Sequence, residues 1–166
     1  MVLGLDVSTS CVGYAFTKNK KIIDMGFIDL KKQKTPKEKT FFVLTYLSKS
    51  PYIDKIEKIN IEDNLSGFSG GRTSQQVIVK LAKFNAILGF VIEEEFGVEV
   101  ENINPNTARK QVFGKARIKG VPAKEYVKMK IEKMYDTKKW CKTTSRGNWD
   151  KRNIDAYDGL VMSLYE

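Results

Sequence analysis

Apolar and polar residues along the first thirty positions form the short runs that are typical of β-strands. Three such runs, at residues 2–10, 11–18 and 21–30, follow one another closely. The polar residues 19–21 lie where the second run gives way to the third, and they predict a tight hairpin turn. We therefore expect the chain to open with a three-stranded antiparallel meander that carries an acid, Asp6, near the end of its first strand.

Beyond residue 30 the pattern alternates helical segments with short strands. Apolar spacing predicts helices at 35–50, 73–96, 106–114, 122–135 and 153–166, and strands at 57–65 and 98–105. Gly97 is a suitable terminus for the longest helix, and residues 66–74 form a Gly/Ser-rich loop. Because no repeat or linker divides the chain, we expect one domain over residues 1–166. The predicted fold class is α/β, with a mixed five-stranded sheet flanked by helices.

The final predicted helix, residues 153–166, is mostly apolar but carries two aspartates one turn apart, Asp155 and Asp158. Carboxylates rarely share a buried face unless a positive group pairs with them. One explanation is local, because Asn153 could cap the helix and acids stabilise a helix start through the helix dipole. The other explanation is that these aspartates meet acids on the strands.

Composition narrows the chemistry that such acids could perform. The chain has no histidine, which removes the commonest general base and the commonest zinc ligand. Its two cysteines, Cys11 and Cys141, lie far apart in different contexts, so neither a disulfide framework nor a zinc site is indicated, and a reducing intracellular setting is expected. Hydrolytic chemistry in this chain would have to rest on carboxylates, lysines and a metal.

Charge points to a polyanionic partner. The chain has 29 lysines and arginines against 20 aspartates and glutamates, a net charge of +9. Residues 105–152 hold 15 of the basic residues and only four acids, so this segment accounts for the excess. A basic block of this kind most often attracts nucleic acid, although a merely soluble basic protein is the simpler alternative.

The strand and helix acids could form one site. If the final helix packs beside the first and fourth strands, Asp155 and Asp158 would meet Asp6 and Glu62. Such a cluster would repel itself or bind protons, and two divalent cations would resolve the conflict because Mg²⁺ prefers hard oxygen ligands. Asp63 adjoins Glu62 and is an alternative ligand, but strand alternation would turn these two side chains to opposite faces.

Four stretches in order resemble the RuvC-like Holliday junction resolvases of the RNase H-like superfamily: LGLDVSTSCVGYAF, INIEDN, NPNTARKQVFG with AKEYVKMKI, and IDAYDGLVMSL. The resemblance covers essentially the whole chain. It implies an RNase H-like fold, a homodimer and Mg²⁺-dependent cleavage of four-way DNA junctions, with Mn²⁺ able to replace Mg²⁺. Asp6, Glu62, Asp155 and Asp158 match the family's catalytic, metal-binding acids, and Lys124 matches a lysine near the scissile phosphate.

A further set of residues is expected to bind DNA: Phe68, Arg72, Arg109, Lys110, Lys115, Arg117 and Lys119. Phe68 could stack on a base where a junction opens, or it could make only a small packing contact. Residues 115–122 form a longer stretch than the resemblance leads us to expect, so the roles of the basic residues around it stay open. Trp140 and Trp149, set among lysines and arginines, could touch DNA or anchor a loop.

The leading prediction is a homodimeric, Mg²⁺-dependent endonuclease that resolves four-way junctions by symmetrical cuts. A flap-cutting or RNA-processing nuclease with the same metal site is the nearest alternative, and a non-catalytic DNA-binding module is another. An ATPase or sugar kinase of the actin-like superfamily is a third, because GLDVSTSCVGYA echoes the phosphate-binding hairpin of that group. Against it, Ser8 stands where that hairpin has glycine, and 166 residues leave no room for two such domains.

The apolar face of the helix at 73–96 is wider than one sheet requires, so this helix is expected to form both core and dimer interface. No apolar run was expected to be long enough to cross a bilayer, and no signal-peptide pattern opens the chain. Small size and lysine bias suggest a phage- or virus-type member acting in the cytoplasm, which would be that of the host cell.

Overall fold

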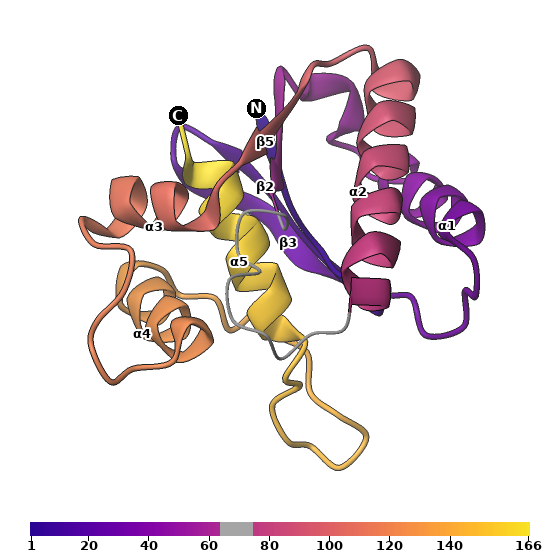
Figure 1. Cartoon of the computed structure of the whole chain (residues 1–166). Helices are drawn as coiled ribbons and strands as arrows, with labels where there is room; N and C mark the ends of the chain where they lie inside the picture. Colours follow the sequence, from indigo (N-terminus) through magenta and orange to yellow (C-terminus); the bar gives the residue numbers. More distant parts are fainter. Residues whose placement is uncertain (64–74) are drawn as a thin grey trace.

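The computed structural model describes residues 1–63 and 75–166, and these residues build a mixed five-stranded sheet of order β3-β2-β1-β4-β5 (Figure 1). Its strands are β1 (Val2–Val7), β2 (Cys11–Lys18), β3 (Lys21–Asp29), β4 (Lys58–Glu62) and β5 (Val100–Ile103). The first three pair antiparallel, whereas β4 runs parallel to β1 and β5 runs parallel to β4. The predicted opening meander and mixed sheet are therefore confirmed.

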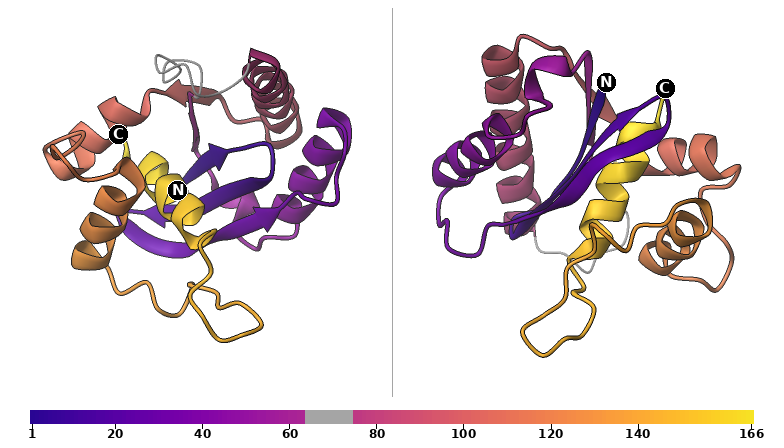
Figure 2. Two further views of the ribbon diagram at one scale, coloured as in Figure 1. Left: turned by 60° about the horizontal axis from the view of Figure 1, so that its bottom comes forward. Right: turned by 180° about the vertical axis from the view of Figure 1, so that it is seen from behind.

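Helices cover both faces of this sheet. They are α1 (Pro36–Ser48), α2 (Gln75–Phe96), α3 (Pro105–Phe113), α4 (Ala123–Met134) and α5 (Asn153–Leu164), with a 3₁₀ turn, η1, at Ile53–Lys55. Figures 1 and 2 show α1 and α2 on one face and α5 on the other, with α3 and α4 beyond α5. The described core is divided in the same way, into one apolar cluster beneath α1 and α2 and another around α5.

Local chemistry explains where several elements begin and end. Asn19 and Lys20 both adopt positive φ angles, 50° and 59°, which gives the two-residue turn that joins β2 to β3. Thr35 caps α1 through a capping box with Glu38. Gly97, at φ 63°, follows the last residue of α2, as predicted from the sequence.

Helix α2 shows that one sequence expectation is wrong. Its 22 residues are long and apolar enough to cross a membrane by length and composition, although no apolar run was expected to be. In the fold, Leu81, Phe84 and Leu88 are buried, and the last two belong to the core cluster on this face of the sheet. Phe90 is 67% exposed on the same helix, so the apolar character of α2 exceeds what the core uses.

Helix α5 lies unusually close to the sheet because glycines stand beneath it. A Cβ added at Gly13 of β2 would come 1.7 Å from the carbonyl oxygen of Asp155, and one at Gly4 of β1 would come 2.2 Å from that of Gly159. From β4, the buried Asn60 side-chain amide donates to the carbonyl oxygens of Met162 and Tyr165, at 2.9 and 3.0 Å. These contacts fix α5 against β1, β2 and β4, and so determine where its two aspartates lie.

Candidate active site

Four carboxylates from three distant parts of the sequence converge at one edge of the sheet. Asp6 lies near the end of β1 and Glu62 is the last residue of β4; since these neighbouring strands are parallel, their carboxyl ends meet. The first turns of α5 bring Asp155 and Asp158 to the same place. The charges of Glu62, Asp158 and Asp155 all act to raise the pKa of Asp6, as expected for one electrostatic cluster.

Burial and mutual repulsion make this cluster costly to ionise. Asp6 is 8% exposed and Asp158 is 2% exposed. Burial, followed by the charges of Glu62, Asp158 and Asp155, raises the pKa of Asp6 well above its usual range. Burial also raises the pKa of Asp158, although the neighbouring Arg109 opposes the change. The pKa of Glu62 is raised to about 7, chiefly by burial and then by the charge of Asp158.

Two basic side chains reach the aspartates of α5. Arg109 of α3 donates from Nη2 to Asp158 Oδ1 at 3.2 Å, and Lys124 of α4 donates from Nζ to Asp155 Oδ1 at 2.7 Å. The Arg109 side chain is only 11% exposed, whereas that of Lys124 is 62% exposed. Partial desolvation lowers the pKa of Lys124, but its hydrogen bond to Asp155 and the nearby acids outweigh this, so the pKa lies above its usual value. The positive groups that the buried aspartates require are therefore an arginine and a lysine.

The donor chemistry of the cluster suits a hard divalent cation. Within residues 1–63 and 75–166, no three Asp, Glu or Cys side chains are already arranged as metal ligands. A physical reason for the absence of such an arrangement is that Arg109 and Lys124 already bind oxygens of Asp158 and Asp155. All four acids offer only oxygen ligands, and a bound divalent ion would relieve the repulsion that raises the pKa of Asp6.

The local explanation for the α5 aspartates is only partly correct. Arg152, not Asn153, occupies the N-cap position, and the Arg152 side chain makes no capping hydrogen bond. The Asn153 side chain instead accepts from the backbone N–H of Lys142 at 2.9 Å and donates to the Lys142 carbonyl at 2.8 Å. Asp155 does lie in the first turn, where the helix dipole favours an acid, but the dipole does not explain the buried Asp158.

At the end of β4, the structure gives Glu62 and Asp63 different surroundings. The charge of Glu62 contributes to the raised pKa of Asp6, which places it in the cluster. The backbone N–H of Asp63 donates to the Ile103 carbonyl at 2.8 Å and extends the pairing of β4 with β5. Glu62 therefore belongs to the cluster, and its metal-binding role, with Asp63 as the alternative, stays a prediction.

The residues expected to bind DNA fall into three groups. Arg109 lies inside the carboxylate cluster. Four others are exposed on α3 and on the segment that follows it: Lys110, Lys115, Arg117 and Lys119. Phe68 and Arg72 lie outside the described residues.

A clamp of charged residues at the start of α5 was not predicted from the sequence. Arg152 donates to both carboxylate oxygens of Asp150, at 3.0 and 2.6 Å, and also to Asp29 at the end of β3. Arg152 thereby ties the entry of α5 to the sheet. The sequence signal for this clamp is the charged run DKR, residues 150–152, immediately before the helix.

The two tryptophans help to pack the segment between α4 and α5. Trp149 is half-buried against Tyr157, with 6.2 Å between ring centroids, and the Lys128 ammonium lies 4.2 Å from its ring centroid. Trp140 is half-buried with Lys139 at 4.0 Å from its ring. The sequence left open whether Trp149 contacts DNA or anchors a loop, and its packing against Tyr157 shows that it anchors this segment.

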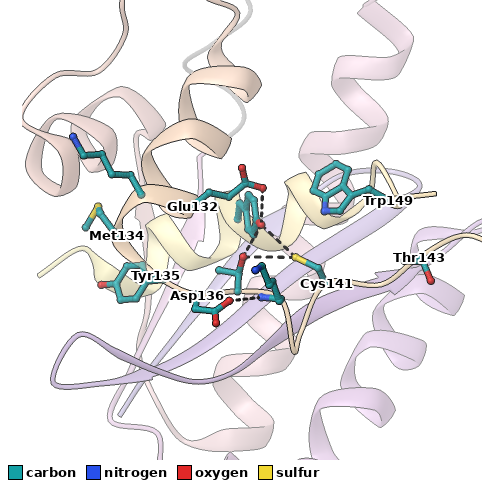
Figure 3. Close-up of a pocket in the computed structure, with 11 residues that line it drawn as sticks. Glu132, Met134, Tyr135, Asp136, Cys141, Thr143 and Trp149 are labelled. Atoms are coloured by element: carbon teal, nitrogen blue, oxygen red, sulfur yellow. Dashed lines mark hydrogen bonds between the residues drawn. The ribbon is translucent and has the colours of Figure 1, made fainter. Parts of the chain in front are cut away.

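A cavity of about 730 Å³ lies beside this segment, between the end of α4 and α5 (Figure 3). Figure 3 shows Glu132, Cys141 and Trp149 around it. The Tyr157 hydroxyl lies 2.8 Å from that of Thr137 and donates to Glu132 at 3.3 Å. The residues that line this cavity include none of the four clustered acids, so it is separate from the candidate active site.

Comparison with known proteins supports the fold but gives no relationship at the level of sequence. No protein-family model and no curated protein matches the chain. Thermus thermophilus RuvC is similar in structure, with a TM-score of 0.63, 14% identity, and coverage of 98% of this chain and 90% of that chain. The same protein in complex with a Holliday junction substrate also gives a TM-score of 0.63, at 12% identity and with 98% and 89% coverage. The chain therefore has the RNase H-like fold of RuvC, as the sequence predicted.

A kinase is also similar, but weakly. The polyphosphate/ATP-glucomannokinase from Arthrobacter sp. strain KM gives a TM-score of 0.43 at 15% identity, covering 72% of this chain and 50% of that chain. A likeness at this level carries no argument for kinase activity.

Proposed function

We propose that this protein is a divalent-metal-dependent endonuclease that cuts branched DNA, with four-way junctions as its preferred substrate. The observation that carries the proposal is the convergence of Asp6, Glu62, Asp155 and Asp158 at one edge of a RuvC-like sheet. Arg109 and Lys124 pair with the aspartates of α5, but burial and neighbouring charge still raise the pKa of Asp6 and that of Glu62. A cationic ligand would therefore stabilise the ionised cluster.

The four acids would hold two Mg²⁺ ions, which Mn²⁺ could replace. When bound, the ions would supply Lewis-acid activation of water and neutralise charge on the phosphodiester. Lys124 is mostly exposed and binds one oxygen of Asp155, so its ammonium can turn from that carboxylate to a phosphate oxygen of the substrate. Arg109 is nearly buried and would stay on Asp158, where it orients the carboxylate.

The exposed basic residues that follow the cluster along the chain would hold the DNA. Lys110, Lys115, Arg117 and Lys119 extend from α3 towards α4, and Arg109 places the start of this segment at the site. Contacts of this kind reach phosphates of any sequence, so binding should weaken steeply as salt increases.

A second copy of the chain would pair through the outer face of α2. This helix exposes the apolar side chains of Val79 (50%), Ile87 (42%) and Phe90 (67%). A four-way junction presents two equivalent strands, which a two-fold symmetric dimer with two equivalent sites would match. The exposed apolar face of α2 and the symmetry of the proposed substrate therefore both favour a homodimer.

The decisive experiment is cleavage of a labelled four-way junction, with and without Mg²⁺, by the wild type, by Asp6→Asn and by the control Asp54→Asn. Asp54 is exposed on η1, so its substitution removes a charge far from the cluster. We expect wild type and control to cut only with metal, and Asp6→Asn to be slower by about a hundredfold or more, because the site loses a ligand charge. Equal cutting by Asp6→Asn and wild type would refute the proposed site.

Cleavage of other substrates, junction binding and thermal stability in ATP separate the alternatives. Equal cleavage of flaps, linear duplexes or RNA would support a related nuclease of wider specificity. Junction binding without metal-dependent cleavage would support a non-catalytic DNA-binding module. Thermal stabilisation by ATP in place of Mg²⁺-dependent cutting would support the actin-like alternative.

A further inference from the structure

Residues 142–150 form a short β-hairpin between α4 and α5, here called the 142–150 hairpin. Thr143 and Trp149 pair across it as an antiparallel bridge, and the Asp150 N–H donates to the Lys142 carbonyl at 3.1 Å. At the tip, the Thr144 N–H donates to the Asn148 carbonyl at 2.7 Å. The residues of this segment are mostly polar, so no apolar alternation marks it as a hairpin in the sequence.

The base of the hairpin is fastened to the rest of the fold at three points. The Asn153 side chain makes two hydrogen bonds with the backbone of Lys142. Arg152 binds Asp150 and also Asp29 of β3. Trp149 packs against Tyr157 of α5. A hairpin held in this way is already ordered before any ligand arrives, so binding to it would cost little conformational entropy.

The hairpin also lies close to the candidate active site. Asp150 precedes Asp155 by five residues, and the clamp of Arg152 lies between them. On α4, Lys124 binds Asp155, and Lys128, one turn later, covers the Trp149 ring. Four residues of an α-helix rise by about 6 Å, so neighbouring turns of α4 contact the carboxylate cluster and the base of the hairpin. Figures 1 and 2 show the hairpin projecting from the body of the molecule beyond the start of α5.

The chemistry of the projecting part suits a nucleic-acid backbone. Every residue from Lys142 to Asn148 is exposed, and the sequence KTTSRGN contains two basic residues, three hydroxyls and an amide but no acid. Gly147, at φ 77°, makes the tip narrow and leaves Arg146 beside it without a bulky neighbour. Hydroxyl, amide and guanidinium donors are the groups that proteins use to hold phosphates and to enter the minor groove.

We propose that the 142–150 hairpin is a preformed contact for one duplex arm of the branched substrate, with Arg146 at its tip binding the arm beside the candidate active site. This inference rests on the proposed function, and it adds a specific element that stands apart from the basic residues of α3 and the segment after it. It also gives a reason for the clamp of Arg152: the same residue that fixes the start of α5 fixes the direction of the hairpin.

The test measures junction binding in Ca²⁺, without cleavage, for wild type, Arg146→Glu, Arg146→Lys and the control Lys55→Glu. Lys55 is exposed on η1, so its reversal changes the net charge equally at a site away from the hairpin. We expect Arg146→Glu to weaken binding about tenfold and to lower the salt dependence of log K by about one, with smaller changes for Arg146→Lys and for the control. Thermal unfolding of all four proteins verifies that the fold is intact.

A second measurement assigns the contact to a duplex arm. Junctions whose arms are progressively shortened should lose affinity for wild type, and the difference between wild type and Arg146→Glu should disappear once the arms no longer reach the hairpin. Equal weakening by Arg146→Glu and Lys55→Glu would overturn the inference, as would an Arg146→Glu effect that persists on the shortest arms. If wild type neither binds nor cuts junctions, the proposed function fails instead, so the two failures are distinguishable.

Discussion

Replacing Glu62 by glutamine tests whether the clustered carboxylates oppose folding when no metal is bound. Glu62 ends β4, half-buried, and burial followed by the charge of Asp158 raises its pKa to about 7. Arg109 and Lys124 offset only part of this effect. Glutamine keeps the size and polarity of the side chain but cannot ionise, so it removes the electrostatic cost and leaves most of the packing unchanged.

The sign and size of the effect follow from proton linkage. In the unfolded chain the pKa of Glu62 is about 4.5, and in the folded protein it is about 7, so the folded state binds the proton more tightly. The stability that the protonated form provides is fully present below pH 4.5 and is lost as the pH rises through 7. A shift of about 2.5 units corresponds to about 3 kcal/mol at pH 8, and to less than about 1 kcal/mol at pH 5.

The assay is urea or thermal unfolding in EDTA from pH 5 to pH 8, with Glu99→Gln as the control on an exposed acid before β5. We expect Glu62→Gln to be more stable than wild type by about 3 kcal/mol at pH 8, which is about 8 °C in Tm for a chain of this size, and nearly equal to it at pH 5. The control should follow wild type throughout. The electrostatic reasoning is refuted if Glu62→Gln gives no gain at pH 8, or the same gain at both pH values.

Three further substitutions test the catalytic, packing and assembly arguments. Lys124→Met keeps the length of the side chain but removes the ammonium near Asp155; it should slow single-turnover junction cleavage by about 10²–10³-fold with little change in affinity, and an unchanged rate would contradict the proposed role. Gly13→Ala places a methyl group 1.7 Å from the Asp155 carbonyl oxygen, so urea unfolding should show a loss of about 3 kcal/mol, and an unchanged midpoint would contradict the close packing of α5. Phe90→Asp puts a charge on the outer face of α2 and should convert a dimer to a monomer in sedimentation experiments; an unchanged oligomeric state would show that this face is not the interface.

The sequence alone was sufficient for the order of the elements. Short apolar runs separated by polar residues define β1, β2 and β3, and the turn at Asn19 and Lys20 follows from local backbone preference. Gly97 marks the end of α2 because glycine readily adopts the positive φ angle found there. These features depend on residues that are neighbours in the sequence, so the sequence alone is enough to predict them. For α2, the helix was predicted at nearly its full length, but its mean hydropathy is high enough for a membrane span by length and composition, which was not expected.

The candidate active site could be predicted from the sequence only in part. Two acids in an apolar helix and two acids at strand ends predicted a carboxylate cluster, because burying charge demands an explanation. The partners of those acids could not be assigned, since Arg109 and Asp158 are 49 residues apart and Lys124 and Asp155 are 31 residues apart. The family resemblance singled out Lys124 as a lysine near the substrate, but nothing local indicated which acid Lys124 or Arg109 would bind.

The capping of α5 and the hairpin before it show the same limit. Asparagine is a residue type that often caps helices, but in the fold the Asn153 side chain binds the backbone of Lys142 instead. No apolar periodicity reveals the 142–150 hairpin in the sequence. The hairpin is instead held in place by Arg152, Asn153 and Trp149 at its base.

By itself, the chain determined which segments become strands and helices, that its basic charge is concentrated between residues 105 and 152, and that histidine chemistry is excluded. Only the tertiary structure decided which basic side chains pair with the aspartates of α5, how close α5 comes to the sheet, and where the hairpin points. The physical reason is that periodicity and turn preference act between neighbouring residues. Ion pairing and close packing are instead settled between side chains that folding alone brings together.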